Sequence, residues 1–172
     1  MSMSKPSRYL ATAALLAAAA AAGWWVLAAG PGRSPAPEVR FTLLDGQQVS
    51  SAQLKGQVVL VNFWATSCST CVAEMPQVMA TFEKYKARGY QTLAVAMSYD
   101  PPAYVASFAE TRKLPFGVAI DNTGEIARSF GQVQLTPTSF LINKRGEIVK
   151  RYVGAPDFAA LQQLVEQLLT EA

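Results

Sequence analysis

The chain has 172 residues, and 51% of them are hydrophobic, which is enough for one domain with a buried core and a short additional segment. Its 15 Lys and Arg exceed its 12 Asp and Glu by three, and Lys5, Arg8 and Arg33 account for that excess. The rest of the chain has no surplus of cations for a nucleic-acid-binding face, so we expect no nucleic-acid partner. The chain also has no His, so most hydrolase mechanisms lack their commonest acid–base group.

Residues 1–30 have the pattern of an N-terminal signal anchor. Lys5 and Arg8 precede an uncharged apolar run over residues 10–29, which as a helix would span roughly 30 Å, the thickness of a bilayer core. The core of a secretory signal is usually shorter, although residues 26–28 also resemble a cleavage site. We expect an uncleaved transmembrane helix in a bacterial inner membrane, with the remaining chain in the periplasm or otherwise outside the cytoplasm.

Residues 31–37 are rich in Pro and Gly and contain no apolar run. Such a composition disfavours regular structure and makes a fairly stiff connection. We therefore expect a linker over 31–37 that separates the membrane from a single folded domain over residues 38–172.

The first half of the domain contains a hairpin signal and a strand-to-helix signal. Residues 41–43 and 48–50 flank an Asp-Gly turn and predict a small β-hairpin. The apolar run over 58–64 predicts a central strand. A helical pattern follows over 68–88 and ends at Gly89, a residue typical of helix C-termini.

The second half of the domain alternates between strand and helix patterns. Strands are predicted over 92–98, 116–120, 139–142 and 148–153, and helices over 102–112, over 125–130 and after the N-cap residue Asp157. This order predicts an α/β fold with a central mixed β-sheet and helices on both faces.

Cys68 and Cys71 are the only cysteines, and they lie where the predicted central strand turns into the predicted helix. A structural zinc site would need four Cys or His ligands, and covalent haem attachment would need His where Val72 stands. No metal site is therefore expected. A structural bridge closing so short a loop would stabilise the fold only weakly. We therefore interpret the pair as a redox-active dithiol, with the Cys68 sulfur at the helix N-terminus, where a thiolate is favoured.

The sequence resembles the TlpA/ResA-like thiol–disulfide oxidoreductases of the thioredoxin superfamily over residues 38–172. The resemblance lies in the motif Phe63-Trp64-Ala65-x-x-Cys68-x-x-Cys71, in Glu74 and Pro76, and in the segment 135–142. It implies a thioredoxin-like fold with an N-terminal β-hairpin and with the extra helix-and-strand insertion of that branch. Cytoplasmic thioredoxins have an acidic residue where this chain has Asn62, which favours the TlpA/ResA-like branch.

The resemblance also implies roles for residues around the cysteines. The Thr136-Pro137 bond should be cis and lie against the disulfide, with the Thr136 backbone free to pair with a substrate strand. Trp64 should flank the disulfide, as a packing residue and at the edge of the substrate site. Glu74 would accept the proton of Cys71 and modulate both thiol pKa values, whereas the plain alternative is a solvated Glu early in a helix.

Together these features predict a membrane-anchored thiol–disulfide oxidoreductase that reduces protein disulfides, for example in cytochrome c maturation or copper-site assembly. Its expected reductant is a membrane thiol-electron transporter, and it would need no cofactor beyond the Cys68–Cys71 disulfide. One alternative is a thiol oxidase of the DsbA kind, although Ser69-Thr70 lacks the His of that group. Another is a metallochaperone that holds Cu(I) between the two thiolates.

Overall fold

The computed structural model describes residues 33–171, and the predicted signal anchor over 1–30 lies outside them. Within 33–171, no helix is both long and apolar enough to cross a membrane. The chain divides into two units, and the fold below is that of the second unit, Ser34–Ala172.

A six-stranded mixed sheet forms the centre of the fold, in the order β1-β8-β7-β4-β5-β6. β4, β5 and β6 are parallel, whereas β7 runs antiparallel to β4, and β8 runs antiparallel to β7 and β1. The strands are β1 (Ser34–Pro35), β4 (Val58–Trp64), β5 (Tyr90–Ala96), β6 (Gly117–Ile120), β7 (Thr138–Ile142) and β8 (Glu147–Val153). The predicted hairpin forms a separate two-stranded sheet, β2 (Arg40–Thr42) and β3 (Gln48–Ser50).

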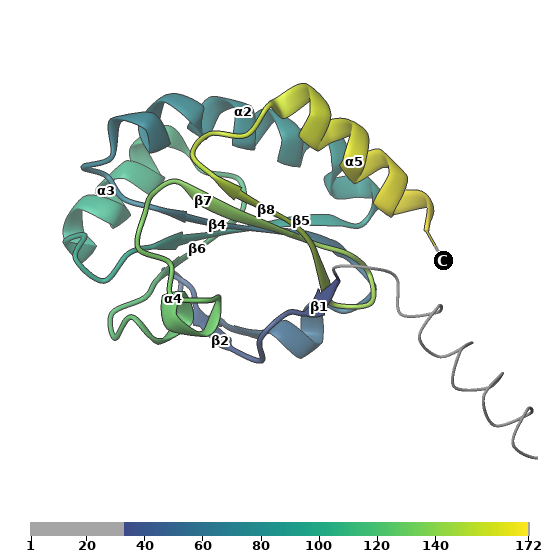
Figure 1. Ribbon diagram of the computed structural model, residues 1–172. Coiled ribbons are helices and arrows are strands. Elements are labelled where there is room, and N and C mark those ends of the chain that lie inside the picture. Colours follow the sequence, from purple (N-terminus) through teal and green to yellow (C-terminus); the bar gives the residue numbers. More distant parts are fainter. Residues whose placement is uncertain (1–32, 172) are drawn as a thin grey trace, which may run out of the picture. The chain divides into compact units, whose positions relative to one another are not determined.

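Helices cover both faces of the sheet, as predicted (Figure 1). α2 and α5 lie on one face, and α4 lies with β2 on the other. The helices are α2 (Ser69–Tyr85), α3 (Pro102–Arg112), α4 (Glu125–Ser129) and α5 (Phe158–Thr170), with short 3-10 helices at Ser51–Leu54 and Lys86–Arg88. Gly89 ends the long helical segment with a φ of 88°, the left-handed conformation that glycine adopts without strain. Asp157 caps α5, as predicted, by accepting hydrogen bonds from two backbone N–H groups.

The central strand β4 explains why the fold has two hydrophobic cores. Successive side chains of a strand point to opposite faces, and all seven residues of β4 are buried. Val58, Leu60 and Trp64 join the core beneath α2, α3 and α5, whereas Val59, Val61 and Phe63 join the core beneath α4 and the hairpin. Each such fully buried side chain stabilises the fold by about 1.5–3 kcal/mol, so β4 is a rigid base for the residues that follow it.

Several element boundaries shift by a residue or so from the sequence-based prediction, and the largest differences are at β1 and β5. Ser34 and Pro35, expected in an unstructured linker, form β1 and pair with Ile148 and Glu147 of β8. Pro35 is tolerated because β1 is an edge strand, where a missing N–H donor costs little. β5 begins and ends two residues earlier than predicted, at Tyr90 and Ala96, so the residues after it form a turn rather than a strand.

Candidate active site

The two cysteines form a disulfide at the N-terminus of α2. Cys68 is the N-cap residue, and its Sγ accepts a hydrogen bond of 3.1 Å from the backbone N–H of Cys71. Cys68 is partly exposed, whereas Cys71 is fully buried. The predicted position of the first sulfur is therefore confirmed: a backbone N–H of the first helical turn donates to Cys68, the more exposed of the two cysteines.

A short turn carries the chain from β4 into α2 and sets the position of Cys68. The N–H of Cys68 bonds to the carbonyl of Ala65 at 3.1 Å, and the N–H of Val72 bonds to the carbonyl of Cys68 at 3.0 Å. The first bond closes the turn, and the second begins the helix. Because β4 is buried along its whole length, the turn is anchored on the rigid centre of the sheet.

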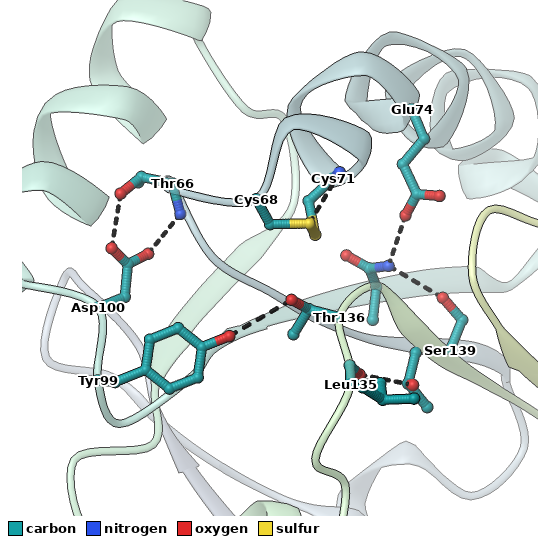
Figure 2. Close-up of a disulfide and its surroundings, with 11 residues drawn as sticks. Thr66, Cys68, Cys71, Glu74, Tyr99, Asp100, Leu135, Thr136 and Ser139 are labelled. Atoms are coloured by element: carbon teal, nitrogen blue, oxygen red, sulfur yellow. Dashed lines mark hydrogen bonds between the residues drawn. A yellow bond between two sulfur atoms is a disulfide. The ribbon is translucent and has the colours of Figure 1, made fainter.

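The predicted cis bond between Thr136 and Pro137 is confirmed. The loop is held by two hydrogen bonds of 2.8 Å, from Thr138 Oγ1 to the carbonyl of Leu135 and from the N–H of Gly154 to the carbonyl of Pro137. β7, which follows the loop, pairs directly with β4, so the loop reaches the same end of the sheet as the cysteines. Figure 2 shows Thr136 below Cys68, on the side of the disulfide away from α2.

Glu74 lies one turn into α2, and its side chain is only 5% exposed. Its Oε1 accepts a hydrogen bond of 3.1 Å from Nδ2 of Asn62, and the same Nδ2 donates to Oγ of Ser139 at 2.9 Å (Figure 2). Burial raises the pKa of Glu74 to about 7, and the bond from Asn62 opposes that rise. A solvated surface Glu, the plain alternative, is therefore wrong, and Glu74 has the pKa of a general base at neutral pH.

Trp64 is fully buried in the core beneath α2, in the same cluster as Cys71. Its ring centroid lies 5.0 Å from that of Phe108 on α3. This burial fits the packing role and is at odds with the prediction that Trp64 borders the substrate site. A side chain with no exposed surface cannot contact a docked chain, so Trp64 is a packing residue of the core that also holds Cys71.

Two residues of the site were not predicted from the sequence, and both follow β5. Asp100 is 2% exposed, and its carboxylate accepts two hydrogen bonds of 2.6 Å from the N–H and the Oγ1 of Thr66. The Tyr99 hydroxyl lies 3.3 Å from Oγ1 of Thr136. Residues that follow neighbouring parallel strands meet at one edge of a sheet, so the predicted strand order could have indicated that the turn after β5 lies beside the cysteines.

The fold is thioredoxin-like, the partly exposed Cys68 sulfur lies at a helix N-terminus, and the buried Glu74 carboxyl lies one turn after Cys71. Together these features define a thiol–disulfide oxidoreductase. Residues 32–166 match the Redoxin family, and the chain belongs to that family.

Known relatives and structures agree with this class. The chain is 35% identical to the thiol-disulfide oxidoreductase ResA of Bacillus thuringiensis subsp. konkukian over 133 residues, which cover 77% of this chain and 76% of the relative. It is 32% identical over 136 residues to ResA of Halalkalibacterium halodurans, covering 78% and 76%.

Among solved structures, a putative thioredoxin from Neisseria meningitidis is 42% identical with a TM-score of 0.75, covering 80% of this chain and 91% of that one. A putative thiol:disulfide interchange protein DsbE from Chlorobium tepidum is 31% identical with a TM-score of 0.73, covering 80% and 96%. The fold and the enzyme class predicted from the sequence are thus confirmed.

Proposed function

We propose that this enzyme works as a reductase of protein disulfides, anchored to a membrane by residues 1–30 and acting outside the cytoplasm. The observation that carries the direction is the charge around the cysteines. Glu74 is a buried acid one turn after Cys71, and its hydrogen bond reaches Asn62 on the strand beneath the motif. Negative charge opposes a thiolate and so favours the oxidised enzyme, which is the property of a reducing couple.

The reaction begins with the exposed sulfur. Reduced Cys68, as a thiolate, attacks one sulfur of a substrate disulfide, and the other substrate sulfur leaves as a thiolate, so that a mixed disulfide forms on Cys68. The Cys71 thiol then gives its proton to the Glu74 carboxylate and attacks the Sγ of Cys68. The second substrate sulfur leaves as a thiolate. Two electrons have passed to the substrate, and the enzyme holds the Cys68–Cys71 disulfide.

The loop before β7 supplies a docking position for the substrate chain. Among the described residues, neither the N–H nor the carbonyl of Thr136 takes part in a backbone hydrogen bond. Thr136 is also partly exposed, while Pro137 behind it is buried. An extended substrate segment can therefore pair with Thr136 as an added strand and bring its cysteine to Cys68. This mode of docking calls for an unfolded or extended protein segment.

The cellular setting is part of the same proposal. The apolar run over residues 10–29 would place the enzyme at an inner membrane, where a membrane thiol-electron transporter can restore the dithiol. Protein segments that must be reduced before they receive haem or copper are the natural substrates of such a position. No cofactor beyond the two cysteines is needed for the exchange.

Trapping tests the proposal directly. In a Cys71→Ser variant the mixed disulfide cannot be resolved, so a partner protein should accumulate covalently on Cys68 and be released by dithiothreitol. A Cys68→Ser variant is the matched control and should trap nothing. Failure of Cys71→Ser to trap any protein, together with tight stoichiometric binding of Cu(I) by the reduced wild type, would replace the enzyme function with a metallochaperone function.

A further inference from the structure

The turn after β5 reaches both loops that make up the active site. The N–H of Met97 bonds to the carbonyl of Trp64 at 3.0 Å, and the N–H of Asp100 bonds back to the carbonyl of Met97 at 2.9 Å. The Asp100 carboxylate then holds Thr66, two residues before Cys68, and Tyr99 contacts Thr136. Figure 2 shows these two contacts on the same side of the disulfide.

The Asp100 carboxylate places a buried negative charge beside the loop that holds Cys68. Both of its oxygens are used, one by the N–H and one by the hydroxyl of Thr66, each at 2.6 Å, and the side chain is almost fully buried. Burying a carboxylate carries a desolvation cost that the neutral side chain of Asn avoids. Asn would offer only one acceptor oxygen for the two donors of Thr66, so the carboxylate serves the geometry of the turn and also places a negative charge beside the Cys68 loop.

The Asp100 carboxylate is hydrogen-bonded to a neutral residue and not to a cation, so its negative charge is not neutralised by its partner and can influence Cys68. Thr66 provides both hydrogen bonds that the structure describes for the Asp100 carboxylate, and it is a neutral partner. Among the described residues, the other ionisable groups that hydrogen-bond within the site or line the hollow beside Thr66 are Glu74 on α2, Tyr99 in the same turn, and Tyr104 and Arg112 of α3. Of these, Arg112 alone is a cation, and its guanidinium lies 5.6 Å from the ring of Phe108.

We propose that Asp100 is a positioning residue that also acts electrostatically. It holds the Cys68 loop through Thr66, and its charge favours the disulfide over the Cys68 thiolate. This inference rests on the proposed reductase function and deepens it, because it makes Asp100 a second acid, beside Glu74, that sets the direction of the enzyme. The two acids act on opposite sides of the disulfide, since Asp100 reaches the loop before Cys68 and Glu74 lies after Cys71.

Three variants separate the charge from the hydrogen bonds. Asp100→Asn keeps the size and one acceptor oxygen but removes the charge. Asp100→Glu keeps the charge but changes the geometry, and Thr66→Val removes the hydroxyl bond alone. Asp45→Asn, which removes an exposed acid from the β2–β3 turn, is the matched control for loss of one negative charge.

Two measurements are made on each full-length variant: the equilibrium constant with glutathione and the pH midpoint of Cys68 alkylation by iodoacetamide. Asp100→Asn should shift the equilibrium toward the dithiol by roughly three- to tenfold, as expected for one charge near the sulfur at partial screening. It should also move the alkylation midpoint to lower pH. Thr66→Val and Asp100→Glu should slow the reaction with disulfides while leaving both quantities near the wild-type values, and Asp45→Asn should change neither.

Wild-type values for Asp100→Asn in both measurements would overturn the inference. If Asp100→Asn does not fold, the remaining variants still decide: a large shift in Asp100→Glu or Thr66→Val would assign the effect to geometry and overturn the electrostatic role. A failure of the proposed function looks different, because the wild type itself would then not reduce a protein disulfide.

Discussion

Asn62 on β4 and Glu74 on α2 are joined by a buried hydrogen bond of 3.1 Å beneath the active-site disulfide. The partner of the carboxyl is thus a neutral amide and not a cation. Asn62 Oδ1 and Glu74 Oε2 are also buried, and among the described residues neither has a hydrogen-bond partner. A proton on Glu74 relieves this burial of charge, which is why burial raises the pKa of Glu74 to about 7.

The resolving step should depend on pH through Glu74. In the proposed mechanism the Glu74 carboxylate accepts the proton of Cys71, so release of substrate from the mixed disulfide should speed up as pH rises through about 7. Glu74→Gln should slow that release by about a hundredfold and flatten its pH profile. Rapid-mixing kinetics with a fluorescent peptide disulfide measures the release. Glu83→Gln, an exposed change on the same helix, should keep the wild-type profile, and an equal effect of both changes would contradict the role of Glu74.

The pH dependence of the folding stability of the oxidised protein should also depend on Glu74. The pKa of its carboxyl is raised in the folded state, so the folded chain binds more protons than the unfolded chain between pH 4.5 and about 7. The favourable contribution is complete below pH 4.5 and is lost as pH rises through about 7. Relative to Glu74→Gln, the wild type should lose about 2 kcal/mol of stability between about pH 4 and pH 8, after discounting for solvent screening. Urea unfolding at both pH values measures this, and a constant difference would contradict burial of the charge.

Selective alkylation tests the placement of the sulfurs. In the reduced enzyme, iodoacetamide should modify Cys68 much faster than Cys71, because Cys68 is partly exposed at the helix N-terminus and Cys71 is fully buried. Mass spectrometry of digests taken over time measures the two rates. Equal rates for the two cysteines would mean that α2 does not begin at Ser69.

Membrane attachment through residues 1–30 is a prediction from the sequence. The full-length protein expressed in a bacterium should remain with membranes through an alkaline carbonate wash, because an apolar helix of that length spans a bilayer. A variant that begins at residue 31 is the control and should be released. A shortened mature form of the full-length protein, cleaved after about Ala28, would contradict the anchor.

The features that the sequence predicts well are those that depend on local pattern. The buried run of β4, the turn at the cysteines and the C-cap at Gly89 each follow from neighbouring residues, and the sequence places them to within a few positions. The cis bond at Pro137 is predicted only through family resemblance, because the dipeptide itself is cis in only a few per cent of cases.

The features that the sequence does not predict depend on distant partners. β1 exists because Ser34 and Pro35 find β8 more than a hundred residues later in the chain, and the composition of 31–37 gives no hint of that pairing. In the sequence, Asp100 looks like an ordinary turn residue before two prolines. Its contact with Thr66 becomes apparent only when β4 and β5 are paired in the sheet. The burial of Trp64 beneath α2 and α3 is set by packing, which no local pattern reports, so the prediction of an edge position for it is wrong.

The reduction potential tests the central claim most directly, since the claim is that buried acids and the absence of His make this enzyme a reductase. Equilibration of the wild type with glutathione buffers, read by thiol labelling, should give a midpoint near thioredoxin's about −270 mV. Glu74→Gln and Asp100→Asn should each move the midpoint to a less negative value, because each removes a negative charge that opposes the Cys68 thiolate. A wild-type midpoint near the about −120 mV of DsbA would contradict the account and identify the protein as a thiol oxidase.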